Sequence, residues 1–133
     1  MSNNQAGEAV QPDGQDADEA LDPRIIAAMQ AELAPETVRQ ILLTAVAEMR
    51  EKGRGCLAAL PDAEHEALRR AAHALVGIAD TVGAVALAAR AREVEIVAAQ
   101  ARLPPPQAVA ELERLVAVAA LAVERWLEKA AGG

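Results

Sequence analysis

Apolar residues recur along most of the chain at the three- and four-residue spacing that is typical of amphipathic α-helices. Near the start of this pattern, Ile25, Ile26, Met29 and Leu33 would share one face of a helix. No segment alternates apolar and polar residues with a period of two, so the pattern does not favour β-strands. The spacing predicts helices over residues 22–33, 35–51, 60–82, 84–102 and 107–130.

Glycine, proline and capping residues place the ends of these segments. Asp22-Pro23 combines a residue type that caps helix N-termini with a proline suited to the first turn. "APE" (34–36) restarts a helix, and we expect "KGRGC" (52–56) to end it, because two glycines in three residues disfavour a helix. The remaining boundaries are predicted at Leu60-Pro61-Asp62, at Gly83 and at "LPPP" (103–106).

Composition agrees with an all-α fold. Apolar residues make up 53% of the 133 residues but aromatic residues only 1%, which suits closely packed helices better than sheets. We therefore predict one domain over residues 22–131, an antiparallel four-helix bundle preceded by a short extra helix. Residues 1–21 are polar and acidic, and we predict a disordered acidic leader there.

The net charge of −7 is unevenly distributed along the chain. Six acidic residues and no Lys or Arg fall within residues 1–22. In the rest of the chain the numbers of positive and negative side chains are therefore nearly equal. Without a clustered positive excess, we expect no nucleic-acid partner. No apolar run is long enough to cross a bilayer, so we expect no membrane partner. The lone cysteine, Cys56, fits a reducing cytoplasm.

One of the two histidines, His73, lies within the third predicted helix. At about 100° per residue, its ring should point away from Leu68 and Leu75 and toward solvent. Gly77 follows one turn later and leaves the helix surface bare beside the ring, although glycine costs about 1 kcal/mol relative to alanine in a helix. Such a surface suits a partner that must approach the imidazole closely. The predicted neighbours of His73 on this face are Glu66, Arg69, Arg70, Val76, Gly77 and Asp80.

An exposed histidine can act as a nucleophile, because neutral imidazole carries a free lone pair at neutral pH. The guanidinium groups of Arg69 and Arg70, one turn earlier, would offset the charge of a phosphoryl group attached to the ring. Most solvent-facing histidines on helices have no such role, and geometry alone favours that plainer interpretation for His73.

The stretch "HALVGIADTVG" (73–83) changes this balance, because it resembles the signature of histidine-containing phosphotransfer (HPt) domains, roughly H-x-L-K-G-x-x-x-x-x-G. His73, Leu75, Gly77 and Gly83 fall in register, and Glu95 occupies a position where the family favours Glu or Gln. The resemblance implies an antiparallel four-helix bundle in which His73 accepts the phosphoryl group on Nε2. It also implies that Glu95 accepts a hydrogen bond from Nδ1 and so orients the ring.

The resemblance further implies a phosphocarrier without ATP-binding or catalytic machinery of its own, and therefore not an enzyme. The partners would be a sensor histidine kinase and a response-regulator receiver domain, which supplies the aspartate and holds the Mg²⁺. This chain itself is expected to need no cofactor or metal. The receiver is expected to dock on Glu66, Val76, Gly77 and Asp80.

One position departs from the family pattern: Val76 stands where phosphotransfer domains usually carry lysine. Arg69 or Arg70 could substitute for that charge. The departure leaves a second hypothesis open, in which the bundle binds or sequesters a receiver without accepting phosphate. Under the first hypothesis the chain is either a free-standing carrier, which the initial Met1 and the final Gly-Gly favour, or the phosphoacceptor domain of a chemotaxis-type kinase.

Overall fold

The computed structural model describes residues 14–132, and within this range it contains helices and no strands. A short helix and a ten-residue helix come before four longer ones. The helices are α1 (Gly14–Glu19), α2 (Pro23–Glu32), α3 (Pro35–Ala58), α4 (His65–Val82), α5 (Val85–Ala99) and α6 (Pro106–Gly132).

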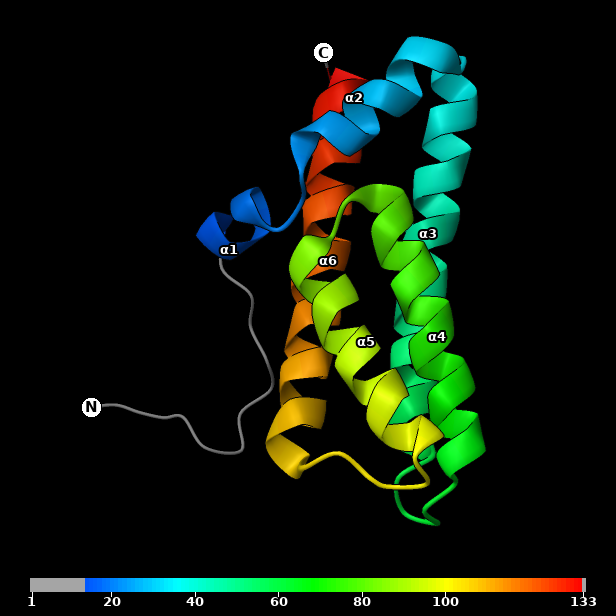
Figure 1. The fold of residues 1–133 in the computed structure, drawn as a ribbon. Coiled ribbons are helices and arrows are strands. Elements are labelled where there is room, and N and C mark those ends of the chain that lie inside the picture. The colour runs from blue at the N-terminus through cyan, green and yellow to red at the C-terminus, as the bar shows by residue number, and fades with distance from the viewer. Residues whose placement is uncertain (1–13, 133) are drawn as a thin grey trace, which may run out of the picture.

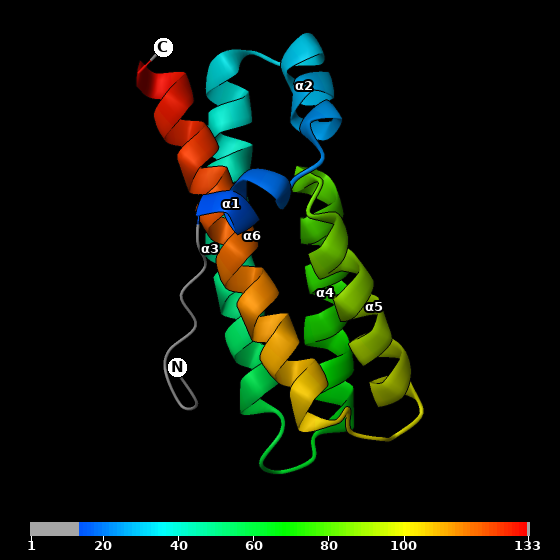
Figure 2. The same ribbon diagram turned by 90° about the vertical axis from the view of Figure 1, so that its left-hand side faces the viewer.

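The four longer helices, α3 to α6, form the predicted four-helix bundle (Figures 1 and 2). Each packs against two others in the cyclic order α3, α4, α5, α6, so that α3 also meets α6. The helix α2 crosses one end of the bundle, contacts α3 and α4, and is the short extra helix expected from the sequence. The fold class is therefore confirmed.

The core consists of aliphatic side chains and alanines, and no polar or charged residue of the described chain is buried. Leu42, Leu68, Leu75 and Leu87 are among the fully buried large side chains, each of which contributes about 1.5–3 kcal/mol through burial. Alanines such as Ala79, which is 0% exposed, fill the remaining contacts between helices. Small residues let helix backbones approach closely, which explains how a core without Phe or Tyr can be filled.

Two predicted boundary residues hold the α4–α5 turn in place. Asp22 caps α2, because its side chain accepts a hydrogen bond from the backbone N–H of Arg24 at 3.0 Å. Gly83 ends α4 in the left-handed conformation, with φ of 79°. The carbonyl oxygen of Gly83 also accepts a 2.8 Å hydrogen bond from the backbone N–H of Asp22. The α4–α5 hairpin is thereby tied to the start of α2.

The predicted helix end at "KGRGC" is wrong, because α3 continues through these residues to Ala58. Both glycines face neighbouring helices at short range. A Cβ at Gly53 would lie 3.4 Å from the side chain of Val116 on α6, and one at Gly55 would lie 3.6 Å from Ala71 on α4. The glycines therefore serve close helix packing at this point, and tertiary contacts outweigh their low helix propensity.

The third predicted helix, α4, begins later than expected, at His65 and not near Leu60. Ala63 adopts the left-handed conformation, with φ of 52°, which interrupts the helical backbone. The next residue, Glu64, donates its backbone N–H to the carbonyl oxygen of Ala59 at 2.9 Å and closes this turn. At the end of α5, Ala101 has φ of 57°, so that helix also ends before its predicted limit.

The predicted leader, residues 1–21, divides into two parts. Residues 1–13 lie outside the described residues. Residues 14–19 form α1, which contacts α6, so the prediction of disorder does not hold for this part. Ala17 is buried, and the carboxylate of Asp16 lies 3.7 Å from the guanidinium of Arg114. The buried alanine and the ion pair hold this acidic segment against the bundle. Composition alone does not indicate such contacts.

Candidate functional site

The α4–α5 hairpin carries the histidine that the sequence singled out. The His73 side chain is 71% exposed, and its ring reaches toward α5, where Nδ1 lies 2.8 Å from Oε2 of Glu95. Glu95 is 24% exposed, so its carboxylate is partly sheltered between the helices while the ring remains open to solvent. The expectation of a solvent-facing ring within reach of Glu95 agrees with this geometry.

The contact with Glu95 determines which ring nitrogen is free. An ionised carboxylate can only accept hydrogen bonds, so Nδ1 of His73 is the donor. In the neutral ring the lone pair then resides on Nε2, the nitrogen that points away from Glu95. The arrangement presents Nε2 as a nucleophile and can support the positive charge that forms when Nε2 is substituted.

A cluster of charges lies one to two turns before His73 on α4. Glu66 accepts two hydrogen bonds from Arg69, at 3.0 and 2.6 Å, and also lies 3.4 Å from Arg70. The hydrogen bond from Arg69 holds the pKa of Glu66 below its usual value. The same bond raises the pKa of Arg69, and the charge of Glu95 adds to this effect. Arg69 is therefore electrostatically coupled to the carboxylate that binds the histidine.

A second ion pair lies on the other side of His73. The guanidinium of Arg92 on α5 donates a 3.0 Å hydrogen bond to Asp80 on α4. Gly77 lies between His73 and Asp80 along this face of α4, and a Cβ built on it would meet no atom within 4 Å. Arg92 was missed in the sequence, although it lies three residues before Glu95 and therefore on the same face of α5.

Val76 differs from its predicted environment. The sequence pattern placed it as an exposed apolar residue beside His73, but its side chain is half-buried and packs against the core. On α5, Ile96 directly follows Glu95 and is 58% exposed. The difference arises because α4 is covered on two sides, by α3 and α5, so fewer of its positions reach solvent.

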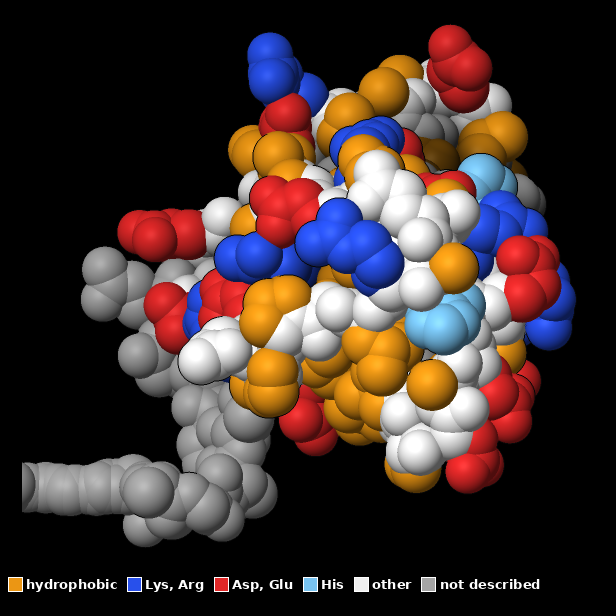
Figure 3. Space-filling view, turned by 60° about the horizontal axis from the view of Figure 1, so that its bottom comes forward, with side chains coloured by type: hydrophobic (Ala, Val, Ile, Leu, Met, Phe, Trp, Pro, Cys, Tyr) orange, Lys and Arg blue, Asp and Glu red, His pale blue; other side chains and the backbone are white. Residues whose placement is uncertain are grey.

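The surface near the histidines is chemically mixed. Figure 3 shows pale-blue histidine atoms at the surface beside blue and red charged side chains, with hydrophobic side chains distributed around them. Within residues 14–132, no group of three or more His, Cys, Asp and Glu side chains is arranged to hold a metal ion. In the same part of the chain, no helix combines the length and the apolar character that crossing a membrane requires.

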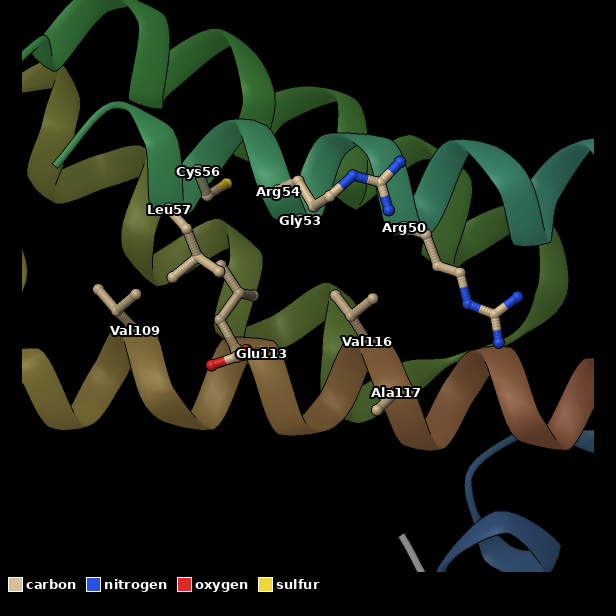
Figure 4. Close-up of a pocket in the computed structure, with 10 residues that line it drawn as sticks. Arg50, Gly53, Arg54, Cys56, Leu57, Val109, Glu113, Val116 and Ala117 are labelled. Carbon is tan, nitrogen blue, oxygen red and sulfur yellow. The ribbon is translucent and has the colours of Figure 1, made fainter. Parts of the chain in front are cut away.

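A separate pocket of about 190 Å³ lies between α3 and α6 (Figure 4). Leu57, Val109 and Val116 line it together with Cys56. Cys56 is almost fully buried, and burial raises the pKa of its thiol to about 11. None of the lining residues belongs to α4 or α5, so this pocket is distinct from the surface around His73.

A four-helix bundle with an exposed histidine on its second long helix is the arrangement expected of a histidine phosphotransfer domain. Comparison with known families agrees, because residues 40–125 match the Hpt domain. The chain therefore belongs to the Hpt domain family, which acts in two-component phosphorelays.

A solved structure supports this assignment. The chain is similar to the crystal structure of histidine-containing phosphotransfer protein B (HptB) from Pseudomonas aeruginosa PAO1, with a TM-score of 0.77 and 29% sequence identity. The match covers 84% of this chain and 96% of that protein. No curated protein matches the chain at a significant level.

Proposed function

We propose that this protein relays phosphoryl groups through Nε2 of His73, between a histidine kinase or the aspartate of one receiver and the aspartate of a response-regulator receiver. The observation that carries the proposal is the 2.8 Å contact between Nδ1 of His73 and Glu95, together with the 71% exposure of the ring. One nitrogen is oriented by the protein, and the other is left accessible to a partner.

The reaction is a phosphoryl exchange between a carboxylate and an imidazole. The lone pair on Nε2 attacks phosphorus, an N–P bond forms, and the P–O bond of the aspartyl phosphate breaks with its electron pair returning to the carboxylate. The Nδ1 proton stays on the ring, where the negative charge of Glu95 offsets the charge of the phosphorylated imidazolium. The reverse sequence delivers the group to an acceptor aspartate.

This chain would hold and orient the group, while its partner would supply most of the remaining chemistry. A receiver that carries Mg²⁺ would bind the phosphoryl oxygens, and the chain itself would need neither ATP nor a metal. Arg69 and Arg70 would support the charge from the preceding turn of α4. We place the receiver contact on Glu66, Val76, Gly77 and Asp80, and the relay in the cytoplasm.

Transfer of label from a phosphorylated receiver tests the proposal. Wild-type protein should gain acid-labile phosphate, and the variant His73→Gln should gain none. His65→Gln is the matched control, because it changes the other histidine of the same helix and should label like wild type. The alternative is a module that sequesters a receiver, for which the valine at position 76 is the best argument. In that case binding would persist in all three proteins and no label would transfer.

A further inference from the structure

Two ion pairs flank His73 on α4, and they differ in how firmly they are held. Before the histidine, Arg69 donates two hydrogen bonds to the carboxylate of Glu66, of 3.0 and 2.6 Å. Beyond it, the contact between Arg92 and Asp80 is one hydrogen bond of 3.0 Å. A two-point contact between guanidinium and carboxylate is considerably stronger than a one-point contact. Arg92 is therefore more easily drawn to a new anion than Arg69 is.

The exposure of the second pair also favours exchange. The side chains of Arg92 and Asp80 are 53% and 54% exposed. Ion pairs in such surroundings contribute about 0–1 kcal/mol, because water screens them. A phosphoryl group offers up to two negative charges and three acceptor oxygens, so it can compete with a single exposed carboxylate.

The path between Arg92 and the histidine is short and open. His73, Gly77 and Asp80 follow one another along a single face of α4, at offsets of about one turn. Gly77 has no side chain, and the space where a Cβ would stand is empty to 4 Å. On α5, Arg92 lies about 4.5 Å along the helix axis from Glu95, whose carboxylate already contacts the ring. An arginine side chain is long enough to cover that offset.

We propose that Arg92 is a phosphoryl-binding residue, whose guanidinium leaves Asp80 and binds a phosphoryl oxygen once Nε2 of His73 is phosphorylated. The inference rests on the proposed function. Arg92 would supply from α5 a positive charge on the Gly77 side of His73, where α4 carries the uncharged, half-buried Val76. No bond of the reaction is made or broken by Arg92, and Asp80 returns to water during the exchange.

Four variants separate this role from a structural one. Arg92→Ala removes the cation, Arg92→Lys keeps a charge, and Asp80→Asn releases Arg92 from its competitor. Arg90→Ala is the matched control, because Arg90 also lies on α5 and forms a 2.6 Å ion pair with Glu93. Each protein is labelled from a phosphorylated receiver, and the extent of labelling, the half-life of the isolated phosphoprotein and the melting temperature are measured.

We expect Arg92→Ala to shorten the half-life of the phosphohistidine and to lower its yield on the order of fivefold, with an unchanged melting temperature. Arg92→Lys should recover part of the loss, and Arg90→Ala should match wild type. For Asp80→Asn the test is the half-life of the isolated phosphoprotein, which does not depend on the receiver contact proposed for Asp80, and this half-life should match or exceed that of wild type. The inference is overturned if Arg92→Ala behaves like Arg90→Ala while wild type labels normally. It is equally overturned if Asp80→Asn shortens the half-life of the isolated phosphoprotein as Arg92→Ala does, because the ion pair itself would then matter. A wild-type protein that takes up no label would refute the proposed function itself.

Discussion

The Nδ1 atom of His73 and the Oε2 atom of Glu95 lie 2.8 Å apart, although 22 residues separate them in the sequence. The contact bridges α4 and α5, so the orientation of the ring depends on the packing of two helices and not on one. The turn at Gly83, which is tied to Asp22, determines how these helices meet. The chemistry proposed for the histidine is thus coupled to the fold through one carboxylate and one turn.

Removing this carboxylate should slow phosphorylation without unfolding the bundle. In Glu95→Ala the ring loses its acceptor. We expect the rate of labelling from a phosphorylated receiver to fall about 10- to 100-fold, the loss that is typical when the hydrogen-bond partner of a metal-binding histidine is removed. Glu95→Gln keeps a neutral acceptor oxygen, so its labelling rate should lie between that of wild type and that of Glu95→Ala. Labelling kinetics and thermal denaturation, measured on the same samples, check the prediction.

Glu93→Ala is the control for this experiment. Glu93 lies on the same helix and is paired with Arg90, away from His73. It should label at the wild-type rate. If Glu95→Ala instead lowers the melting temperature sharply, Glu95 is a structural residue and its proposed role is wrong.

Gly77→Gln should weaken receiver binding and leave the fold intact. A Cβ at this position meets nothing within 4 Å, so the protein itself can accommodate the longer side chain. Replacing glycine within a helix should also stabilise the bundle, by about 0.5–1 kcal/mol. A receiver that approaches the ring would meet the new side chain, and we expect its dissociation constant to rise on the order of tenfold. Titration calorimetry or fluorescence anisotropy measures the change.

The matched substitution is Ala110→Gln, which adds the same side chain at an exposed position on α6. It should leave receiver affinity unchanged. Equal affinity for Gly77→Gln and wild type would show that the receiver docks elsewhere.

Much of the fold could be predicted because its signals are local. Periodic apolar residues, the Asp22-Pro23 cap and the glycine at position 83 each act within one or two turns of the chain, and the structure agrees with them. The end of α3 could not be predicted in this way. Gly53 and Gly55 weaken a helix locally, but they face Val116 and Ala71 across helix interfaces that no local pattern records.

The site shows the same division between local and tertiary information. The exposure of His73 follows from helical spacing within α4. Its contact with Glu95 came only from the resemblance to phosphotransfer domains, because nothing in the spacing alone pairs residues on two helices. Arg92 was missed for this reason, since its partner Asp80 lies on the neighbouring helix. Val76 was placed in solvent because the coverage of α4 by α3 and α5 could not be foreseen.

Gly83→Ala should destabilise the protein. The residue has φ of 79°, which costs an alanine roughly 1–2 kcal/mol. A Cβ there would also lie 2.9 Å from the Ile25 side chain and 3.0 Å from the carbonyl oxygen of Asp22, so α2 would have to shift. We expect the free energy of unfolding, from urea titration, to fall by about 1–3 kcal/mol. Gly77→Ala, which has neither a positive φ nor a close contact, should not lower it.

Cys56 should be unreactive in the folded protein. Its thiol is buried, and burial raises its pKa from 9.0 to about 11, so the reactive thiolate is scarce at pH 8. An alkylating reagent should label Cys56 only after denaturation. Because the folded state disfavours the thiolate, this group leaves stability unchanged below about pH 9 and reduces it as the pH rises toward 11. In Cys56→Ala that part of the alkaline loss of stability should be absent, and rapid labelling of the native protein would contradict the burial of the thiol.

Val76→Lys tests whether a charge is missing next to His73. Val76 is half-buried against the core, and a lysine there can lay its methylene groups over the same surface and extend its ammonium group into water. We expect a small loss of stability, below about 1.5 kcal/mol, and a higher yield of phosphohistidine. The same substitution should restore labelling in the Arg92→Ala background, because one cation would replace the other.

Val85→Lys is the control. It adds an identical charge at an exposed position at the start of α5 and should have no effect on labelling. If Val76→Lys gives no more phosphohistidine than Val85→Lys in either background, the charge beside the ring does not limit the reaction, and the valine is compatible with efficient transfer.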